Sequence, residues 1–379
     1  MSLHPPSIGL LDHFSALEDP RQSWRVIYPL PEIMLLVLSA TIAGMEDFVQ
    51  IRLWGRERLE FLRRFLPFER GIPAHDTLNG VINALDAELF QSCFSSWVEA
   101  LQDHQPDIIA IDGKTSRRTH DRSRGRQPLH LVSAWASRQR LVLGQEAVEE
   151  KSNEIIAIPR LLERLELAGA LVTIDAIGTQ SKIAETIVGR GGDYLFSLKA
   201  NRPALLSDVA AFFADPLNAS ACEHVETVDN DHGRHETRSH FVSHNIEWLK
   251  SDRRCSDELA FPHLATIAMV QTTTERGDKI AHERRYYISS AKMDAKTFAL
   301  AVRAHWGVEN RLHWVLDVIF HDDLSRLRSG FGPQNMAVFK HMAMNMIRKP
   351  KDKHSLKNRR TLAALNHDYM EALIRQASN

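Results

Sequence analysis

Two short segments of this chain share one pattern, in which an apolar run leads directly into an aspartate that is followed by small residues. DIIAIDGKT (107–115) contains Asp112, and LVTIDAIGTQ (171–180) contains Asp175. Each apolar run is typical of a buried strand, and the acid stands where the strand is expected to end. Two central strands that end in this way would bring two carboxylates to one edge of a sheet. The chain is therefore expected to fold around a sheet that holds two acids side by side.

The segments around these aspartates predict a mixed sheet with helices on its faces. Strand-like runs lie at 107–115, 129–137, 141–149, 170–178 and 193–200, and helix-like runs lie at 153–169 and 180–191. The short polar connection between the second and third strands is a hairpin signal. The predicted order is β-β-β-α-β-α-β followed by a helix, in the α/β class. This order matches a ribonuclease-H-like core, although an analogy of fold does not by itself establish chemistry.

The rest of the chain predicts further regions around this core. Residues 1–100 have the apolar spacing of amphipathic helices with arginines between, and this helical domain either contacts DNA or packs on the next domain. Residues 101–348 would form the ribonuclease-H-like catalytic domain, with a β-rich insertion at about 220–290. Residues 349–379 are expected to form a basic carboxy-terminal tail.

The composition is that of an ordinary globular protein with locally concentrated basic charge. The chain has 379 residues, a net charge of −1 and 44% apolar residues, which allows one large or two ordinary domains. Its three cysteines have no paired spacing, which suits a reducing cytoplasm. The longest apolar stretch, 33–43, is too short to span a membrane, so no membrane partner is expected. Basic residues concentrate at 114–126 and 348–360, as solvated loops or as phosphate-contacting patches.

The two strand-end aspartates predict a metal site. Carboxylate oxygens that leave open positions for water and phosphate suit Mg²⁺ or Mn²⁺. Taken singly, a strand-end aspartate more commonly starts a turn or caps a helix. The presence of both Asp112 and Asp175 in this strand order favours a metal pair.

A third ligand is expected from a helix that packs across the same edge. The segment 305–323 supplies Glu309, His313 and Asp317, which are spaced i, i+4 and i+8 and so lie within about one face of a helix. A polar stripe beside an apolar one is also typical of an ordinary helix at a solvent boundary. The spacing alone does not choose between Glu309 and Asp317.

Several longer segments occur together in a way that is specific to one family. They are GIPAHDTL, IAIDGKTSRR, EEKSNEIIAIPRLLERL, TIDAIGTQ, GGDYLFSLKAN, DHGRHETR, RYYISS and HWGVENRLHWVLDVIFHDD. From about residue 14 to residue 348, the chain resembles the DDE transposases of bacterial insertion sequences. Within these it is similar to the subgroup that includes the H-repeat-associated proteins of Rhs elements. The resemblance implies that Asp112 and Asp175 are the first two catalytic acids and that Glu309 is the third.

The resemblance also implies a reaction, a cofactor and a partner. Two Mg²⁺ ions, with Mn²⁺ as a substitute, would be held by the three acids. Water would first free a 3′-OH at the element end, and this 3′-OH would then attack target DNA. The expected partner is double-stranded DNA, as element ends and as target, so the cytoplasmic protein would associate with the nucleoid. The sequence leaves open whether the protein forms a homodimer on DNA, because no segment is recognisable as a dimerisation helix.

Cations near the acids are expected to contact DNA phosphates. The candidates are Lys114, Arg117, Arg118, Lys199, Arg311 and His313. For Lys199, a lysine that extends its ammonium to solvent from a strand end is an equally good interpretation. Related transposases often have Tyr, Arg and Lys around the third acid, where this chain has Val302, His305 and Leu316. This departure leaves open which residue holds the DNA end, with Arg303 and Asn310 as further candidates.

Two other functions stay open at the level of the sequence. One is a catalytically silent DNA-binding protein descended from a transposase, and the other is a ribonuclease-H-like nuclease of unrelated purpose. The presence of all three carboxylates favours an active transposase over the silent descendant. The unrelated nuclease would explain the core but neither the amino-terminal helices nor the insertion.

Overall fold

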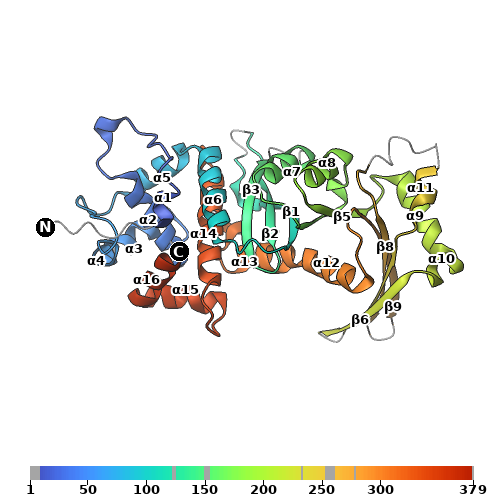
Figure 1. Ribbon diagram of the computed structural model, residues 1–379. Helices are drawn as coiled ribbons and strands as arrows, with labels where there is room; N and C mark the ends of the chain where they lie inside the picture. Colours follow the sequence, from blue (N-terminus) through green and yellow to red (C-terminus); the bar gives the residue numbers. More distant parts are fainter. Residues whose placement is uncertain are drawn as a thin grey trace.

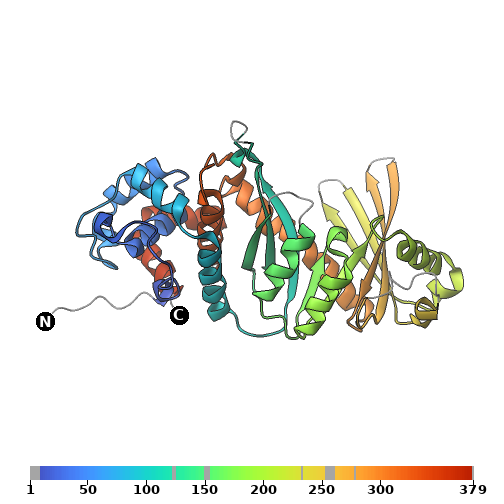
Figure 2. The ribbon, with the colours of Figure 1, turned by 90° about the horizontal axis from the view of Figure 1, so that it is seen from above.

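The computed structural model describes residues 9–121, 125–148, 154–231, 234–251, 261–276 and 279–377. The molecule is elongated, with helices at one end, a sheet covered by helices in the middle, and long strands accompanied by helices at the other end (Figure 1). The first described helix, α1, and the last, α16, both lie at the helical end. Figure 2 shows the same three parts in a row from above.

The helical end is built from the amino-terminal segment. Its helices are α1 (Gly9–Asp12), the 3₁₀ helix η1 (Ser23–Arg25), α2 (Leu30–Ile42), α3 (Phe48–Glu57), α4 (Leu59–Leu62), α5 (His75–Ala84) and α6 (Ala87–Leu101). Helix α2 is buried on all sides, as expected for a core helix that is apolar almost throughout. Asp47 and Asp86 begin α3 and α6, because each side chain accepts a hydrogen bond from a backbone N–H of the first turn.

Among the described residues, nine strands form one mixed sheet in the order β3-β2-β1-β4-β5-β9-β8-β7-β6. They are β1 (Ile108–Ser116), β2 (Leu129–Ala136), β3 (Leu141–Val148), β4 (Leu171–Ile174), β5 (Asp193–Leu198), β6 (Glu223–Asp231), β7 (Arg234–Ser243), β8 (Thr266–Arg276) and β9 (Lys279–Ser289). The predicted α/β fold with a mixed sheet is therefore confirmed.

The three central strands β1, β4 and β5 are parallel, so their carboxyl ends meet at the same edge of the sheet. Ile111 of β1 is paired with Ile174 of β4, which places the next residues, Asp112 and Asp175, beside each other. One expectation about β1 is wrong, because the strand does not end at Asp112. It continues to Ser116 because antiparallel pairing with β2 extends four residues further.

Helices cover the two faces of the central strands. Helices α7 (Glu154–Glu163) and α8 (Ser181–Gly189) lie on one face. The other face is covered by one nearly continuous segment, made of α12 (Ala295–Gly307), the π-helix η7 (Val308–His313) and α13 (Trp314–Val318). This segment carries all the residues that were considered for the third acid.

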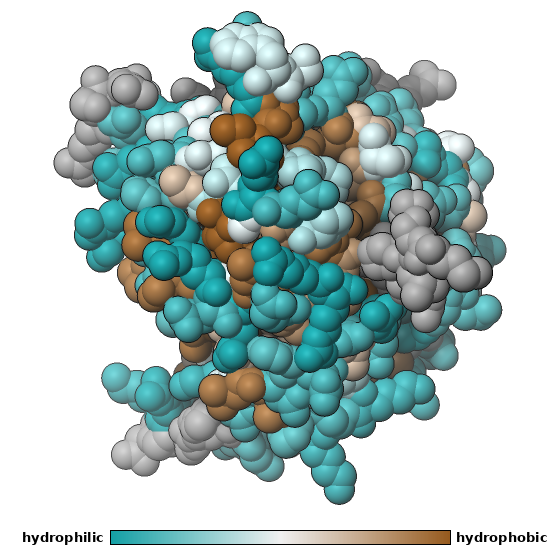
Figure 3. Space-filling model, turned by 90° about the vertical axis from the view of Figure 1, so that its left-hand side faces the viewer, coloured by the Kyte–Doolittle hydropathy of each residue, from teal (hydrophilic) through white to brown (hydrophobic). Residues whose placement is uncertain are grey.

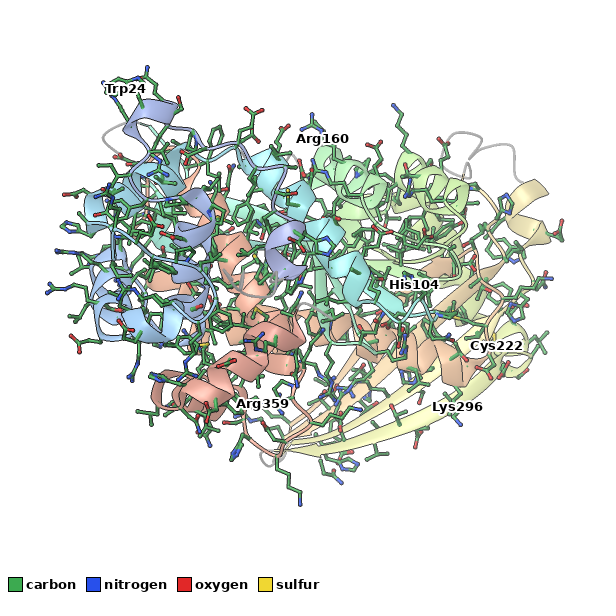
Figure 4. The ribbon with its side chains drawn as sticks, turned by 60° about the vertical axis from the view of Figure 1, so that its left-hand side comes forward. Trp24, His104, Arg160, Cys222, Lys296 and Arg359 are labelled. Atoms are coloured by element: carbon green, nitrogen blue, oxygen red, sulfur yellow. The ribbon has the colours of Figure 1, made fainter. Side chains whose placement is uncertain are left out.

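The strands β6 to β9 do not form a separate domain, because β9 pairs with β5 and so extends the central sheet. Helices α9 (Pro203–Ala214), α10 (Pro216–Ser220) and α11 (Glu247–Ser251) lie with them at the far end of the molecule. Helix α12 packs against both β1 and β7, so the insertion and the central strands share one covering helix. In Figure 4 the labelled Lys296, near the start of α12, lies beside these strands.

The predicted basic tail is wrong. After the 3₁₀ helix η8 (Asp322–Leu324), the chain forms α14 (Gly332–Arg348), α15 (Leu356–Leu365) and α16 (His367–Gln376). Helix α14 packs against α2, α5 and α6, and the last two helices lie beside the amino-terminal ones (Figure 4, near the labelled Arg359). Two arginines of the basic run are buried here, because their guanidinium groups donate to backbone carbonyls rather than to solvent.

The surface of the helical end is mainly hydrophilic, with several separate apolar areas (Figure 3). The exposed large apolar residues of this region include Trp24, Ile27, Val49, Leu53 and Leu365, and Trp24 projects outward in Figure 4. Among the described residues, no helix is long and apolar enough to cross a membrane.

Arg360 ties the carboxy-terminal helices to the amino-terminal ones. Its guanidinium donates to the carbonyls of Thr41 and Ile42 at the end of α2 and to the carbonyl of Ile319. We expect Arg360→Ala to lower the free energy of unfolding by about 2 to 4 kcal/mol, because buried carbonyls lose their donors. Urea unfolding followed by circular dichroism measures this loss. The matched control, exposed Lys357→Ala on the same helix, should change stability by less than about 0.5 kcal/mol; equal losses for both variants would contradict the role of Arg360.

Candidate active site

Three carboxylates line one cavity of about 660 Å³ at the carboxyl edge of the central strands. They belong to Asp112, Asp175 and Glu309. Lys199, which directly follows β5, and His305 of α12 line the same cavity. The structure therefore brings together the three acids that the sequence singled out, from two neighbouring strands and the helix packed across them.

Each acid is positioned by a different local structure. Asp112 lies inside β1, where its backbone is paired with Ser133 of β2. Asp175 directly follows β4, and its side chain also accepts a hydrogen bond from the backbone N–H of Ile177 at 3.1 Å. Asp175 therefore both caps the turn that follows its strand and lines the cavity. Glu309 lies in a π-helical turn, a rare conformation that occurs mostly as single turns at functional sites.

Asp112 is the most perturbed carboxyl group of the site. Burial raises the pKa of Asp112 from its ordinary value of 3.8 to about 7, and the carboxylates of Asp175, Glu309 and Glu154 act in the same direction. The hydrogen bond from the Gly113 N–H opposes this shift without cancelling it. The charged groups that raise the pKa of Asp112 are therefore carboxylates, and Lys199 is the lysine that lines the same cavity.

Two histidines border the acids, and both are poor sources of positive charge. The Nδ1 of His313 lies 3.6 Å from Asp112 Oδ2, and its Nε2 is buried with no hydrogen-bond partner in the part of the chain that the structure describes. Burial and the ammonium of Lys114 lower the pKa of His313 to about 4, so the ring is neutral at pH 7. His305 shares a hydrogen bond of 3.0 Å with Thr173, and burial also lowers its pKa.

Lys114 has a different environment from the one predicted. Its side chain is only 10% exposed, and its Nζ lies 2.6 Å from Asp317 Oδ1, close enough for an ion pair although not aligned as a hydrogen bond. Asp322 and Asp323 lie 3.9 and 3.5 Å from the same ammonium. The expected phosphate contact of Lys114 is therefore replaced by contacts with acids. Asp317 takes part in this cluster and does not line the cavity of the three acids, whereas Glu309 does.

The other cations predicted to contact DNA are more accessible. Arg117 is 82% exposed at the side chain, with one contact of 3.3 Å to Asp323. Arg118, Lys199 and Arg311 are also exposed. His313 differs from them, because it is mostly buried and neutral at pH 7.

A hydrogen-bonded pair next to Asp112, made of Glu154 and His130, was not predicted from the sequence. Glu154, at the start of α7, accepts or shares a hydrogen bond of 2.6 Å with His130 Nε2, and the other ring nitrogen lies 2.7 Å from Thr115 Oγ1. A Cβ atom at Gly113 would lie 2.6 Å from Glu154 Oε1, so this pair explains why glycine follows Asp112. Glu154 belongs to one of the segments that carry the family resemblance. Because it lies far from Asp112 in the sequence, their proximity could not be inferred from the sequence alone.

Comparison with known proteins defines the class to which this chain belongs. Residues 103–346 match the model of the transposase DDE domain, and residues 11–98 match the model of the region associated with that domain. The chain therefore belongs to the family of transposases with a DDE domain, and the resemblance inferred from the sequence is confirmed.

Individual relatives support this membership. "H repeat-associated putative transposase YhhI" of Escherichia coli K12 is 35% identical over 96% of this chain and 97% of its own length. "Putative transposase YncI" of Escherichia coli O157:H7 is 38% identical over 98% of this chain and 95% of its own. A solved piggyBac transposase synaptic complex with hairpin DNA aligns with 94% of this chain and 75% of that chain, at 10% identity and a TM-score of 0.41, which is too distant to indicate function.

The raised pKa of Asp112 predicts a pH-dependent gain in stability when its charge is removed. The pKa of Asp112 in the folded protein, about 7, lies above its ordinary value of 3.8. The contribution of this carboxyl group to the free energy of unfolding is therefore fully present below pH 3.8, and it is lost as the pH rises through 7. In EDTA, Asp112→Asn should therefore exceed the wild type in free energy of unfolding by on the order of 3 kcal/mol at pH 8, and by much less at pH 4. Urea unfolding at a series of pH values measures the difference.

The control for this experiment is Glu185→Gln, which neutralises an exposed carboxylate on α8. Its difference from the wild type should stay small and nearly independent of pH. A gain for Asp112→Asn that is the same at pH 4 and pH 8 would show that the carboxyl group is not destabilised by its surroundings.

Proposed function

We propose that this protein is an active DNA transposase. On a ribonuclease-H-like core, it hydrolyses a phosphodiester at each element end and then transfers the freed 3′-OH into target DNA. Asp112, Asp175 and Glu309 are the proposed catalytic acids and the proposed ligands of Mg²⁺, with Mn²⁺ as a substitute. Family membership supports the general function, and the cavity shared by these three carboxylates carries the assignment of residues.

The observation that supports a cation at this site is the gathering of three carboxylates around one cavity. The raised pKa of Asp112 arises from burial and from carboxylates, while the nearest histidine is neutral at pH 7. A donor set made of carboxylate oxygens alone favours Mg²⁺ and Mn²⁺ over softer metals. The chemistry of the residues therefore fits a hard divalent cation.

The three carboxylates are near one another without already forming a closed set of ligands. Among the described residues, no group of three or more His, Cys, Asp and Glu side chains stands close enough together to hold a metal ion as it is. Glu309 is exposed and can change rotamer, whereas Asp112 is mostly buried on a central strand. We infer that Asp112 provides the fixed part of the site and that Glu309 closes on it when the cation binds.

A divalent cation bound there would lower the pKa of a water molecule and stabilise negative charge on the reacting phosphate. The chain supplies position rather than a nucleophile of its own. Asp112 and Asp175 hold oxygen atoms at the edge of the sheet, and Glu309 approaches them from the covering helix. In the first step water displaces the 3′ oxygen of the element end, leaving a 3′-OH and a 5′-phosphate. In the second step that 3′-OH displaces a 3′ oxygen of target DNA.

The proposed path of double-stranded DNA follows the exposed cations around the cavity. Lys199 lines the cavity itself, and Arg117 and Arg118 follow β1. Arg311 lies two residues after Glu309 on the exposed side of the same segment. Phosphate contacts of this kind predict binding that weakens steeply with salt.

The decisive experiment is nicking of supercoiled plasmid in Mn²⁺. We expect Asp175→Asn to lower the rate of nicking by about 10³-fold or more, because an amide at this position cannot replace the carboxylate as a ligand. The measurement is the initial rate of conversion to open-circular plasmid by purified full-length protein. Glu185→Gln, purified in the same way, should retain the rate of the wild type.

Two results would contradict the proposal in different ways. Equal nicking by the wild type and by Asp175→Asn would assign the activity to a contaminant. A wild type that binds DNA in a salt-dependent way but never nicks it would favour the catalytically silent descendant.

A further inference from the structure

Alternate residues on one face of β1 contact the segment that carries Glu309 and the 3₁₀ helix η8 that follows it. Asp112 lies 3.6 Å from His313, and Lys114 lies 2.6 Å from Asp317. One step further along, the Ser116 hydroxyl donates to Asp322. The strand and the covering segment therefore run side by side in the same direction, with three matched contacts that we call the register contacts.

The spacing of the register contacts follows from the two backbone geometries. Two residues along a strand advance about 6.6 Å, and four residues along a helix advance about 6 Å. The strand step from Asp112 to Lys114 therefore matches the helix step from His313 to Asp317. Residues between them on β1 face the opposite side, as shown by Gly113, which lies against Glu154 and His130.

The middle contact is the ionic one, and it is partly buried, because the side chain of Asp317 is 35% exposed. Lys114 is 10% exposed, and two further carboxylates surround its ammonium. Asp322 is held in turn by Lys340 of α14, with Nζ 2.6 Å from Oδ1. Burial would raise the pKa of Asp322, but Lys340, Ser116 and Lys114 together lower it to about 2, so this acid stays charged. The cluster thus connects β1, the end of the covering segment and α14.

Glu309 itself has no such anchor. It is exposed, and its carboxylate forms no hydrogen bond or ion pair with the part of the chain that the structure describes. Its position relative to Asp112 is therefore decided by how the whole segment lies on β1. A shift of one helical turn would move Glu309 by about 5.4 Å, which is enough to remove it from the other acids.

We propose that Lys114 and Asp317 are positioning residues, whose ion pair sets the register of the π-helical turn on β1 and thereby places Glu309 opposite Asp112 and Asp175. The assignment of a function to this pair rests on the proposed transposase site. A partly buried charge pair suits this role because any other register takes the Asp317 carboxylate away from the buried ammonium of Lys114. Setting a register is the best attested use of such pairs.

The first test measures register without any metal. Hydrogen–deuterium exchange with peptide resolution, in EDTA, compares the wild type with Lys114→Met, Asp317→Asn and the double variant. We expect at least about tenfold faster exchange in residues 308–318 in each variant, with β4 and α2 unchanged. Because the two residues act as a pair, the double variant should exchange no faster than either single variant.

The second test measures the consequence for the site. Mn²⁺ alone is titrated into full-length protein and followed by calorimetry. We expect Lys114→Met and Asp317→Asn to weaken Mn²⁺ binding by about 10- to 100-fold, as is typical when a residue that orients metal ligands is removed. Glu309→Gln should weaken it to a similar extent, because both changes remove the same carboxylate from the site.

A control separates positioning from general loss of stability. Arg164→Met breaks the partly buried ion pair between Arg164 and Glu146, with 2.7 Å between Nη1 and Oε2, on β3 and beside α7. This variant should lower the melting temperature without changing exchange in 308–318 or the affinity for Mn²⁺. If it changes both as strongly as Lys114→Met, the effect is one of global stability and the positioning role is overturned.

The possible failures are distinguishable. If exchange in 308–318 is unchanged in Lys114→Met, the pair does not set the register, whatever happens with metal. If exchange rises but Mn²⁺ affinity is unchanged, the register does not control the site and the proposal is again overturned. If the wild type binds no Mn²⁺, the proposed function fails, while the exchange experiment still decides whether the pair sets the register.

Discussion

The parallel pairing of β1 with β4 is the constraint on which the rest of this structure depends. It places Asp112 and Asp175 at one edge of the sheet, where burial and nearby carboxylates raise the pKa of Asp112 to about 7. Because β1 and β4 are paired up to Ile111 and Ile174, the main chain holds the two acids next to each other, and the carboxylate of Asp175 raises the pKa of Asp112. A site lined by three carboxylates is therefore a consequence of the fold, and it is the place that we propose for a divalent cation.

The alternation of side chains along β1 gives the two faces of the strand different tasks. On one face, Gly113 leaves room for the hydrogen-bonded pair of Glu154 and His130, which adds a further buried carboxylate behind the site. On the other face, Lys114 is held by Asp317 at the end of the segment that carries Glu309. Strand β1 thus contributes Asp112, leaves room for Glu154 on its opposite face, and contacts the segment that carries Glu309.

The long carboxy-terminal part of the chain joins regions that are far apart in sequence. Helix α14 packs on α2, α5 and α6, and its Lys340 contacts Asp322 next to the site. Helix α15 continues to the helical end, where Arg360 satisfies the last carbonyls of α2. The amino-terminal helices and the proposed catalytic centre are consequently connected through packed side chains, so the helical end and the sheet form one continuous core.

The sequence by itself determined the features that depend on local patterns: the strands that lead into Asp112 and Asp175, the helical amino-terminal segment, and the family. It also narrowed the third acid to one helix, because a period of four residues can be counted in letters. Only the tertiary structure decided that Lys114 is held by acids instead of lying free, that Glu154 stands behind Asp112, and that the basic end of the chain folds into helices. These features depend on contacts between residues distant in the chain. The sequence does not show whether a lysine or arginine side chain will contact a phosphate, a carboxylate or a backbone carbonyl, because tertiary packing determines its partner.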